Sequence, residues 1–200
     1  MQIVLAQIYP KLGDVAANYQ LLSQEILAAR NRGAGLIVFP ELALTGYFLK
    51  DQIQDLSGAA AEELRRLQEL SADIDIAVGS IEERNGRAYN SAFYLRQGQI
   101  WHTHRKVYLP TYGMFDEKRY FSAGSRFGVF DTAAGQTALL LCEDAWHFSS
   151  AYLAALSGAE NLLILSSSPY REGIQAKWQA INQTLAGHFA MNVIYCNRVG

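Results

Sequence analysis

Short apolar runs recur along this chain, and they constrain its fold more than any other feature. A run of this length without alternating polar residues is typical of a strand whose two faces are both buried. Longer stretches with a helical period separate most of the runs. The sequence therefore predicts a mixed α/β domain in which helices cover one or more buried sheets. The apolar runs are residues 3–8, 36–39, 137–141, 161–166 and 193–197.

Helices and hairpins complete the predicted order. The first helix, residues 18–32, places Tyr19, Leu22, Ile26 and Ala29 on one face. Hairpins between these elements break the strict strand–helix–strand order of a doubly wound sheet, and no glycine-rich phosphate loop follows any strand. A nucleotide site is not expected. The other predicted elements are helices at 59–70, 148–156 and 175–191, a strand at 74–80, a hairpin at 88–106 turning at Gly98, and paired strands at 128–131 and 137–141 turning at Gly135.

Composition narrows the class of protein. A length of 200 residues predicts a single domain, residues 1–200. The charge of -2 comes from 17 basic and 19 acidic residues without a basic stripe, so no nucleic-acid partner is expected. The apolar start lacks a basic leader and a cleavage site, and no run reaches the length needed to cross a bilayer. We expect a cytoplasmic protein with no membrane partner, in which Cys142 and Cys196 stay reduced.

Three reactive side chains follow predicted buried strands: Glu41, Lys106 and Cys142. A thiol is a good nucleophile only as the thiolate, and a base or a nearby cation favours that form. Acyl transfer would follow if Glu41 accepts the thiol proton and Cys142 attacks an amide carbonyl. The ammonium of Lys106 and the backbone N–H of Glu143 would then stabilise the oxyanion. From the residues alone the alternatives stay open, because a cysteine after an apolar strand is more often part of the core.

No metal or cofactor is expected. The histidines at 102, 104, 147 and 188 show no spacing with cysteines or carboxylates that is typical of a metal site. The proposed acyl transfer needs only side chains and water.

Three motifs resemble the nitrilase superfamily of carbon–nitrogen hydrolases. They are FPELALTGY (39–47), HRKVYLPTYGMFDEKRYF (104–121) and LLLCEDAWH (139–147), and the resemblance covers nearly the whole chain. It implies an αββα sandwich with Glu41, Lys106 and Cys142 as the catalytic triad. Glu117 matches a second glutamate that orients the lysine and the substrate, and Asp116 is its rival.

Within the superfamily, the second and third motifs look most like the glutaminase domain of glutamine-dependent NAD synthetases and its stand-alone relatives. The resemblance implies that Tyr112 and Phe115 line the substrate pocket and that Ser168 contacts the amino-acid group of glutamine. The sequence departs from that pattern at Ile174, where those synthetases have a basic residue. Arg171 is the alternative carboxylate ligand, since a carboxylate favours a fixed guanidinium.

Family members continue past the final NRVG segment, so the resemblance also implies that C-terminal strands of the sandwich are missing and that a sheet edge is exposed. It further implies a homodimer or larger assembly through the helix near residues 148–158. Three functions remain in competition: an amidase acting on a small-molecule carboxamide, a glutaminase that supplies ammonia to a separate synthetase partner, and a truncated non-catalytic scaffold.

Overall fold

Two β-sheets form the centre of the molecule. The computed structural model describes residues 1–199, so Gly200, the last residue of the predicted domain, lies outside the described residues. The first sheet has the order β1-β2-β3-β4-β5 and the second has the order β6-β7-β8-β9. The strands are β1 (Ile3–Leu5), β2 (Leu36–Val38), β3 (Asp75–Arg84), β4 (Arg87–Arg96), β5 (Gln99–Arg105), β6 (Val129–Thr132), β7 (Gly135–Leu141), β8 (Asn161–Ser166) and β9 (Asn192–Asn197).

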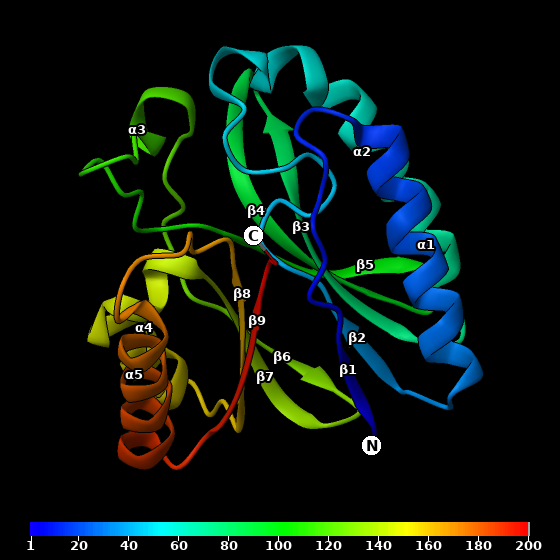
Figure 1. The fold of residues 1–200 in the computed structure, drawn as a ribbon. Helices are drawn as coiled ribbons and strands as arrows, with labels where there is room; N and C mark the ends of the chain where they lie inside the picture. Colours follow the sequence, from blue (N-terminus) through cyan, green and yellow to red (C-terminus); the bar gives the residue numbers. More distant parts are fainter. Residues whose placement is uncertain (200) are drawn as a thin grey trace.

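Helices cover the outer face of each sheet, as Figure 1 shows. Helices α1 and α2 lie on the first sheet, and α4 and α5 lie on the second. The inner faces of the two sheets pack against each other. The predicted αββα sandwich is thereby confirmed. The helices are α1 (Val15–Asn31), α2 (Ile53–Leu70), α3 (Glu117–Tyr120), α4 (Phe148–Leu156) and α5 (Ile174–Phe189), with short 3₁₀ turns η1 (Lys50–Gln52) and η2 (Cys142–Trp146).

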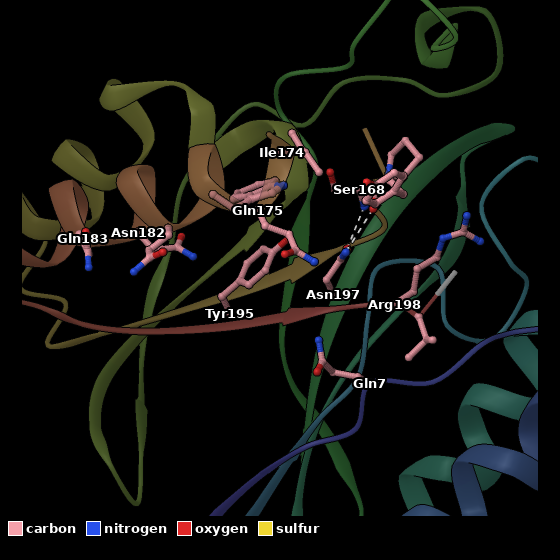
Figure 2. Close-up of a pocket in the computed structure, with 14 residues that line it drawn as sticks. Gln7, Ser168, Ile174, Gln175, Asn182, Gln183, Tyr195, Asn197 and Arg198 are labelled. Carbon is pink, nitrogen blue, oxygen red and sulfur yellow. Dashed lines mark hydrogen bonds between the residues drawn. The ribbon is translucent and has the colours of Figure 1, made fainter. Parts of the chain in front are cut away.

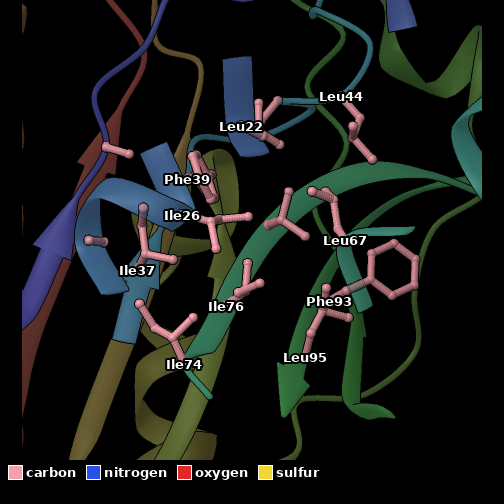
Figure 3. Close-up of a cluster of buried hydrophobic side chains, with 14 of the residues drawn as sticks. Leu22, Ile26, Ile37, Phe39, Leu44, Leu67, Ile74, Ile76, Phe93 and Leu95 are labelled. Carbon is pink, nitrogen blue, oxygen red and sulfur yellow. The ribbon is translucent and has the colours of Figure 1, made fainter. Parts of the chain in front are cut away.

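The position of β2, between the helices and the second sheet, explains why its sequence is apolar throughout. Ile37 points into the cluster beneath α1 and α2 (Figure 3), whereas its neighbour Val38 points into the layer between the sheets. Successive side chains of a strand face opposite sides, so a strand buried on both faces needs apolar residues at every position. On α1, the predicted face of Tyr19, Leu22, Ile26 and Ala29 is buried, which confirms that prediction.

Two element boundaries, the end of β3 and the start of α2, differ most from the sequence prediction. Strand β3 continues to Arg84 and joins β4 through a tight hairpin, whereas a strand ending at residue 80 was expected. The turn residues Asn85 and Gly86 both have positive φ, at 53° and 71°, as a two-residue type I′ hairpin requires. Helix α2 begins at Ile53 and not near residue 59. Among residues 1–199, no helix combines the length and the apolar character that crossing a membrane demands.

Candidate active site

Glu41 lies just beyond the end of β2 and its side chain is fully buried. The side-chain amide of Asn90 donates a hydrogen bond of 2.8 Å to its Oε1. The backbone N–H of Ser167, after β8, donates one of 2.9 Å to its Oε2. The Ser167 hydroxyl also donates to the backbone carbonyl of Glu41, at 2.7 Å. Donors from both sheets therefore fix this carboxylate in place.

The backbone at Glu41 packs closely against Gly79 of β3. A Cβ at position 79 would lie 2.4 Å from the backbone nitrogen of Leu42 and 2.7 Å from the Cα of Glu41. We expect Gly79→Ala to lower the free energy of unfolding by about 1–3 kcal/mol, the usual effect of overpacking a core. Urea unfolding would measure it. The matched control is Gly58→Ala on α2, where nothing lies within 4 Å of the new methyl group; a loss there equal to that at position 79 would contradict the prediction.

Lys106 follows β5, and its side chain is fully buried between two carboxylates. Its Nζ donates to Oε1 of Glu41 at 2.7 Å and to Oε1 of Glu117 at 2.6 Å. Burial lowers the pKa of Lys106, but the two negative charges outweigh it and hold that pKa well above its usual value. The lysine therefore stays charged at neutral pH.

Glu117 opens α3 and is also buried. The hydroxyl of Tyr47 donates a hydrogen bond to its Oε1. Its Oε2 has no hydrogen-bond partner among residues 1–199. Burial raises the pKa of Glu117, Lys106 lowers it and Glu41 raises it, with a net shift upward. The rival residue, Asp116, is exposed, so Glu117 is the acid that the structure places at Lys106.

Cys142 is the first residue after β7 and begins the turn η2. Its φ of +40° lies in the left-handed region, which is uncommon for a residue with a side chain. The hydroxyl of Ser166 donates to its Sγ at 3.4 Å. Burial and the charge of Glu41 raise the pKa of Cys142, whereas Lys106 lowers it; the net shift is upward. The thiol is therefore protonated at neutral pH, and its reaction requires a base.

Tyr112, Phe115, Glu143 and Arg171 form a second group of side chains that lie near one another. The Tyr112 hydroxyl donates a 2.7 Å hydrogen bond to Oε2 of Glu143. Burial raises the pKa of Tyr112 to about 12, and the hydrogen bond to Glu143 is the second cause of this shift. The guanidinium of Arg171 lies 5.9 Å from the ring centre of Phe115. Arg171 and Tyr112 also line a cavity of about 220 Å³ together with Trp146 and Lys177.

Ser168 is placed differently from the other predicted site residues. Its backbone N–H donates to Oδ1 of Asn197 at 2.8 Å, and its carbonyl accepts from Nδ2 at 3.1 Å. Figure 2 shows it at one end of a groove of about 710 Å³ between α5 and β9, which Ile174 also lines. The residues lining this groove do not include Cys142.

Two residues that hold Glu41, Asn90 and Ser167, were not predicted from the sequence, and neither was the hydrogen bond that Tyr47 donates to Glu117. Asn90 and Ser167 contact Glu41 across 49 and 126 positions of sequence. No local pattern reports such contacts. The one available signal for Tyr47 was its place inside the motif that contains Glu41. Within residues 1–199 there is no group of three or more His, Cys, Asp or Glu side chains that could hold a metal ion.

The carbon–nitrogen hydrolase family model matches residues 2–200. The chain belongs to the carbon–nitrogen hydrolase family. Its curated relatives include the glutamine-dependent NAD+ synthetase of Acinetobacter baylyi, 32% identical over 203 residues, and that of Thermotoga maritima, 33% identical over 207 residues. Both alignments cover 100% of this carbon–nitrogen hydrolase but only 37% and 36% of the relatives, so the chain spans little more than a third of their length.

Solved structures agree with the fold of this carbon–nitrogen hydrolase. The glutamine-dependent NAD+ synthetase of Acinetobacter baumannii superposes with a TM-score of 0.89 at 32% identity, covering 99% of this chain and 38% of that one. An amidase from a Nesterenkonia species superposes with a TM-score of 0.91 at 24% identity, covering 100% of this chain and 76% of that one. These likenesses confirm the predicted relation to the nitrilase superfamily.

Proposed function

We propose that this carbon–nitrogen hydrolase cleaves the amide bond of a small carboxamide through a thioester on Cys142. The observation that carries the proposal is the buried Lys106 ammonium, which bonds to Glu41 and Glu117 beside a partly exposed cysteine at the end of β7. A thiol, a base and a fixed cation are the groups that acyl transfer requires.

The first half of the reaction forms the thioester. Glu41 accepts the proton of Cys142, and the sulfur attacks the carbonyl carbon of the amide. Two of the three N–H groups of Lys106 bond to carboxylates, and the third can point at the oxygen that becomes negative. The backbone N–H of Glu143 is the second oxyanion donor. The C–N bond then breaks, and the nitrogen takes the proton from Glu41 and leaves as ammonia or an amine.

The second half regenerates the enzyme. Water attacks the thioester carbonyl as Glu41 takes one of its protons, and the carboxylic acid leaves as the Cys142 sulfur is protonated again. Glu117 holds Lys106 in place and, through Oε2, offers an acceptor to the substrate amide. Tyr112, Phe115, Glu143 and Arg171 form the substrate wall, and Ser168 is a further substrate contact.

A glutaminase is the second candidate function. Relatives that are about a third identical to this chain over the aligned residues include glutamine-dependent NAD+ synthetases. In this version the amide is glutamine, and the ammonia passes to a separate synthetase partner. Arg171 and Lys177 would face the α-carboxylate of glutamine, since both line the cavity beside Tyr112.

We also propose a homodimer formed through α4 in the cytoplasm. Four apolar side chains of this helix are exposed: Phe148, Tyr152, Leu153 and Leu156, with Leu156 at 67%. An exposed apolar patch on a helix is typical of a protein–protein contact.

Ammonia release from a panel of small carboxamides, including glutamine and asparagine, tests the proposed function. We expect release from at least one member of the panel, with a carboxylic acid as the other product. Turnover of glutamine that rises when an NAD+ synthetase domain lacking its own glutaminase is added would favour the second candidate. If a chain that circular dichroism shows to be folded releases no ammonia from any amide, both candidate functions are overturned and a non-catalytic scaffold is favoured.

A further inference from the structure

Asp144 lies two residues after Cys142, and its carboxylate is fully buried. Its Oδ1 accepts hydrogen bonds from the backbone N–H groups of Val107, at 3.0 Å, and Tyr108, at 2.9 Å. Its Oδ2 accepts from the backbone N–H of Leu141, at 3.2 Å, and pairs with Nε2 of His104 at 2.8 Å. Two oxygens thus meet four donors, and the carboxylate is fully satisfied.

The four partners belong to the two segments that carry the proposed reacting groups. Val107 and Tyr108 directly follow Lys106, and Leu141 directly precedes Cys142. His104 lies two positions before Lys106, and the side chains of both residues are buried. A single carboxylate therefore ties the end of β5 to the end of β7.

The hydrogen bonds of Asp144 also stabilise the strained backbone at Cys142. A φ of +40° at a residue with a side chain costs free energy and persists only where the surroundings impose it. The N–H of Leu141, bonded to Asp144, is the last amide before the strained residue. A hydrogen bond to a charged, buried acceptor is strong, and it holds the turn in the conformation that presents the sulfur.

We propose that Asp144 is a positioning residue, which sets the distance between the Lys106 ammonium and the Cys142 sulfur by bonding to both segments at once. The inference rests on the proposed function, in which these two groups act together. Asp144 itself does not contact the substrate. The role of His104 is to donate the side-chain bond that fixes the orientation of the carboxylate.

Asp144→Asn tests the role with little change of shape. An amide has one acceptor oxygen, so its NH₂ group must face two of the four N–H donors. We expect kcat to fall about 10²-fold, the effect of a misplacement near 1 Å, while KM changes little. We expect the rate at which iodoacetamide alkylates Cys142, followed by mass spectrometry of its peptide, to fall in parallel. The matched control is Asp75→Asn, a partly buried carboxylate on β3 that bonds to Tyr94, and it should change neither rate.

A purely structural role predicts another result. Asp144→Asn would then lower the melting temperature but leave kcat and the alkylation rate of the folded protein at wild-type values, and that outcome overturns the proposal. If Asp144→Asn does not fold, His104→Leu and His104→Gln decide the matter. Leucine removes the donor and should slow both rates, whereas glutamine supplies an N–H and should restore much of them. Equal rates in the two variants would overturn the proposal.

The proposed function can fail separately from this inference. Turnover that survives in Cys142→Ala would remove the nucleophile from the mechanism. Wild-type kcat in Asp144→Asn, beside an inactive Cys142→Ala, would remove only the positioning role. Alkylation of Cys142 needs no substrate, so it tests the geometry even if every amide in the panel is inert.

Discussion

Cys142→Ala is expected to lower the turnover of the best carboxamide by about 10⁶-fold, the effect of removing the nucleophile from a comparable catalytic unit. Alanine has no atom that can form the acyl bond, so Glu41 and Lys106 are left with nothing to activate. Because Cys142 is partly exposed and begins a turn, we expect the variant to fold. Steady-state ammonia release, with circular dichroism on the same samples, measures the change.

Cys196→Ala is the matched control. The chain has two cysteines, and the second is fully buried between the sheets, where its Sγ lies 3.3 Å from the carbonyl of Val38. We expect this variant to lose some stability and to keep its kcat. Loss of turnover in a folded Cys196→Ala, or substantial turnover in Cys142→Ala, would contradict the assignment of the nucleophile.

Lys106→Met is expected to lower the free energy of unfolding by about 3–5 kcal/mol at neutral pH. Methionine fills a similar volume but leaves Glu41 and Glu117 buried beside each other without the ammonium that now bonds to both. Breaking a buried ion pair lowers the stability most when it leaves a buried charge without a partner. Urea unfolding at pH 8 would measure the loss.

The loss in the free energy of unfolding of Lys106→Met should depend on pH. Without the lysine, burial and the charge of Glu41 raise the pKa of Glu117 in the folded state above its unfolded value. The folded variant then binds a proton more tightly than the unfolded chain, so its loss of stability is largest above the raised pKa of Glu117 and shrinks as the pH falls through it. Unfolding at pH 8 and pH 5 tests this. Lys11→Met, at an exposed lysine, is the control. A deficit equal at both pH values, or as small as that of the control, would contradict the account.

The sequence predicted the layers of the fold because burial leaves a local pattern. Strand β2 is buried on both faces and so reads as an unbroken apolar run, and the α1 face appears as a helical period. The same reasoning placed Glu41, Lys106 and Cys142 at strand ends. The resemblance in the motifs then favoured Glu117 over Asp116, and the structure places Glu117 at Lys106.

Long-range polar contacts and backbone angles left no such pattern. The hydrogen bond from Ser167 to Glu41 depends on how the second sheet packs on the first. A short stretch of sequence does not indicate this packing. Cys142 follows the predicted strand, as expected, but a cysteine gives no sign of the positive φ with which it begins a turn. The extension of β3 was missed because residues 82–84 are polar where the strand leaves the core.

Hydroxylamine partitioning tests the central claim, a thioester on Cys142, most directly. A thioester reacts with hydroxylamine to give a hydroxamate in place of the carboxylic acid. The account predicts that the hydroxamate rises with hydroxylamine concentration at the expense of the acid, and that Cys142→Ala forms neither product. Turnover that gives only the acid at every hydroxylamine concentration, or hydroxamate formed equally by Cys142→Ala, would contradict it.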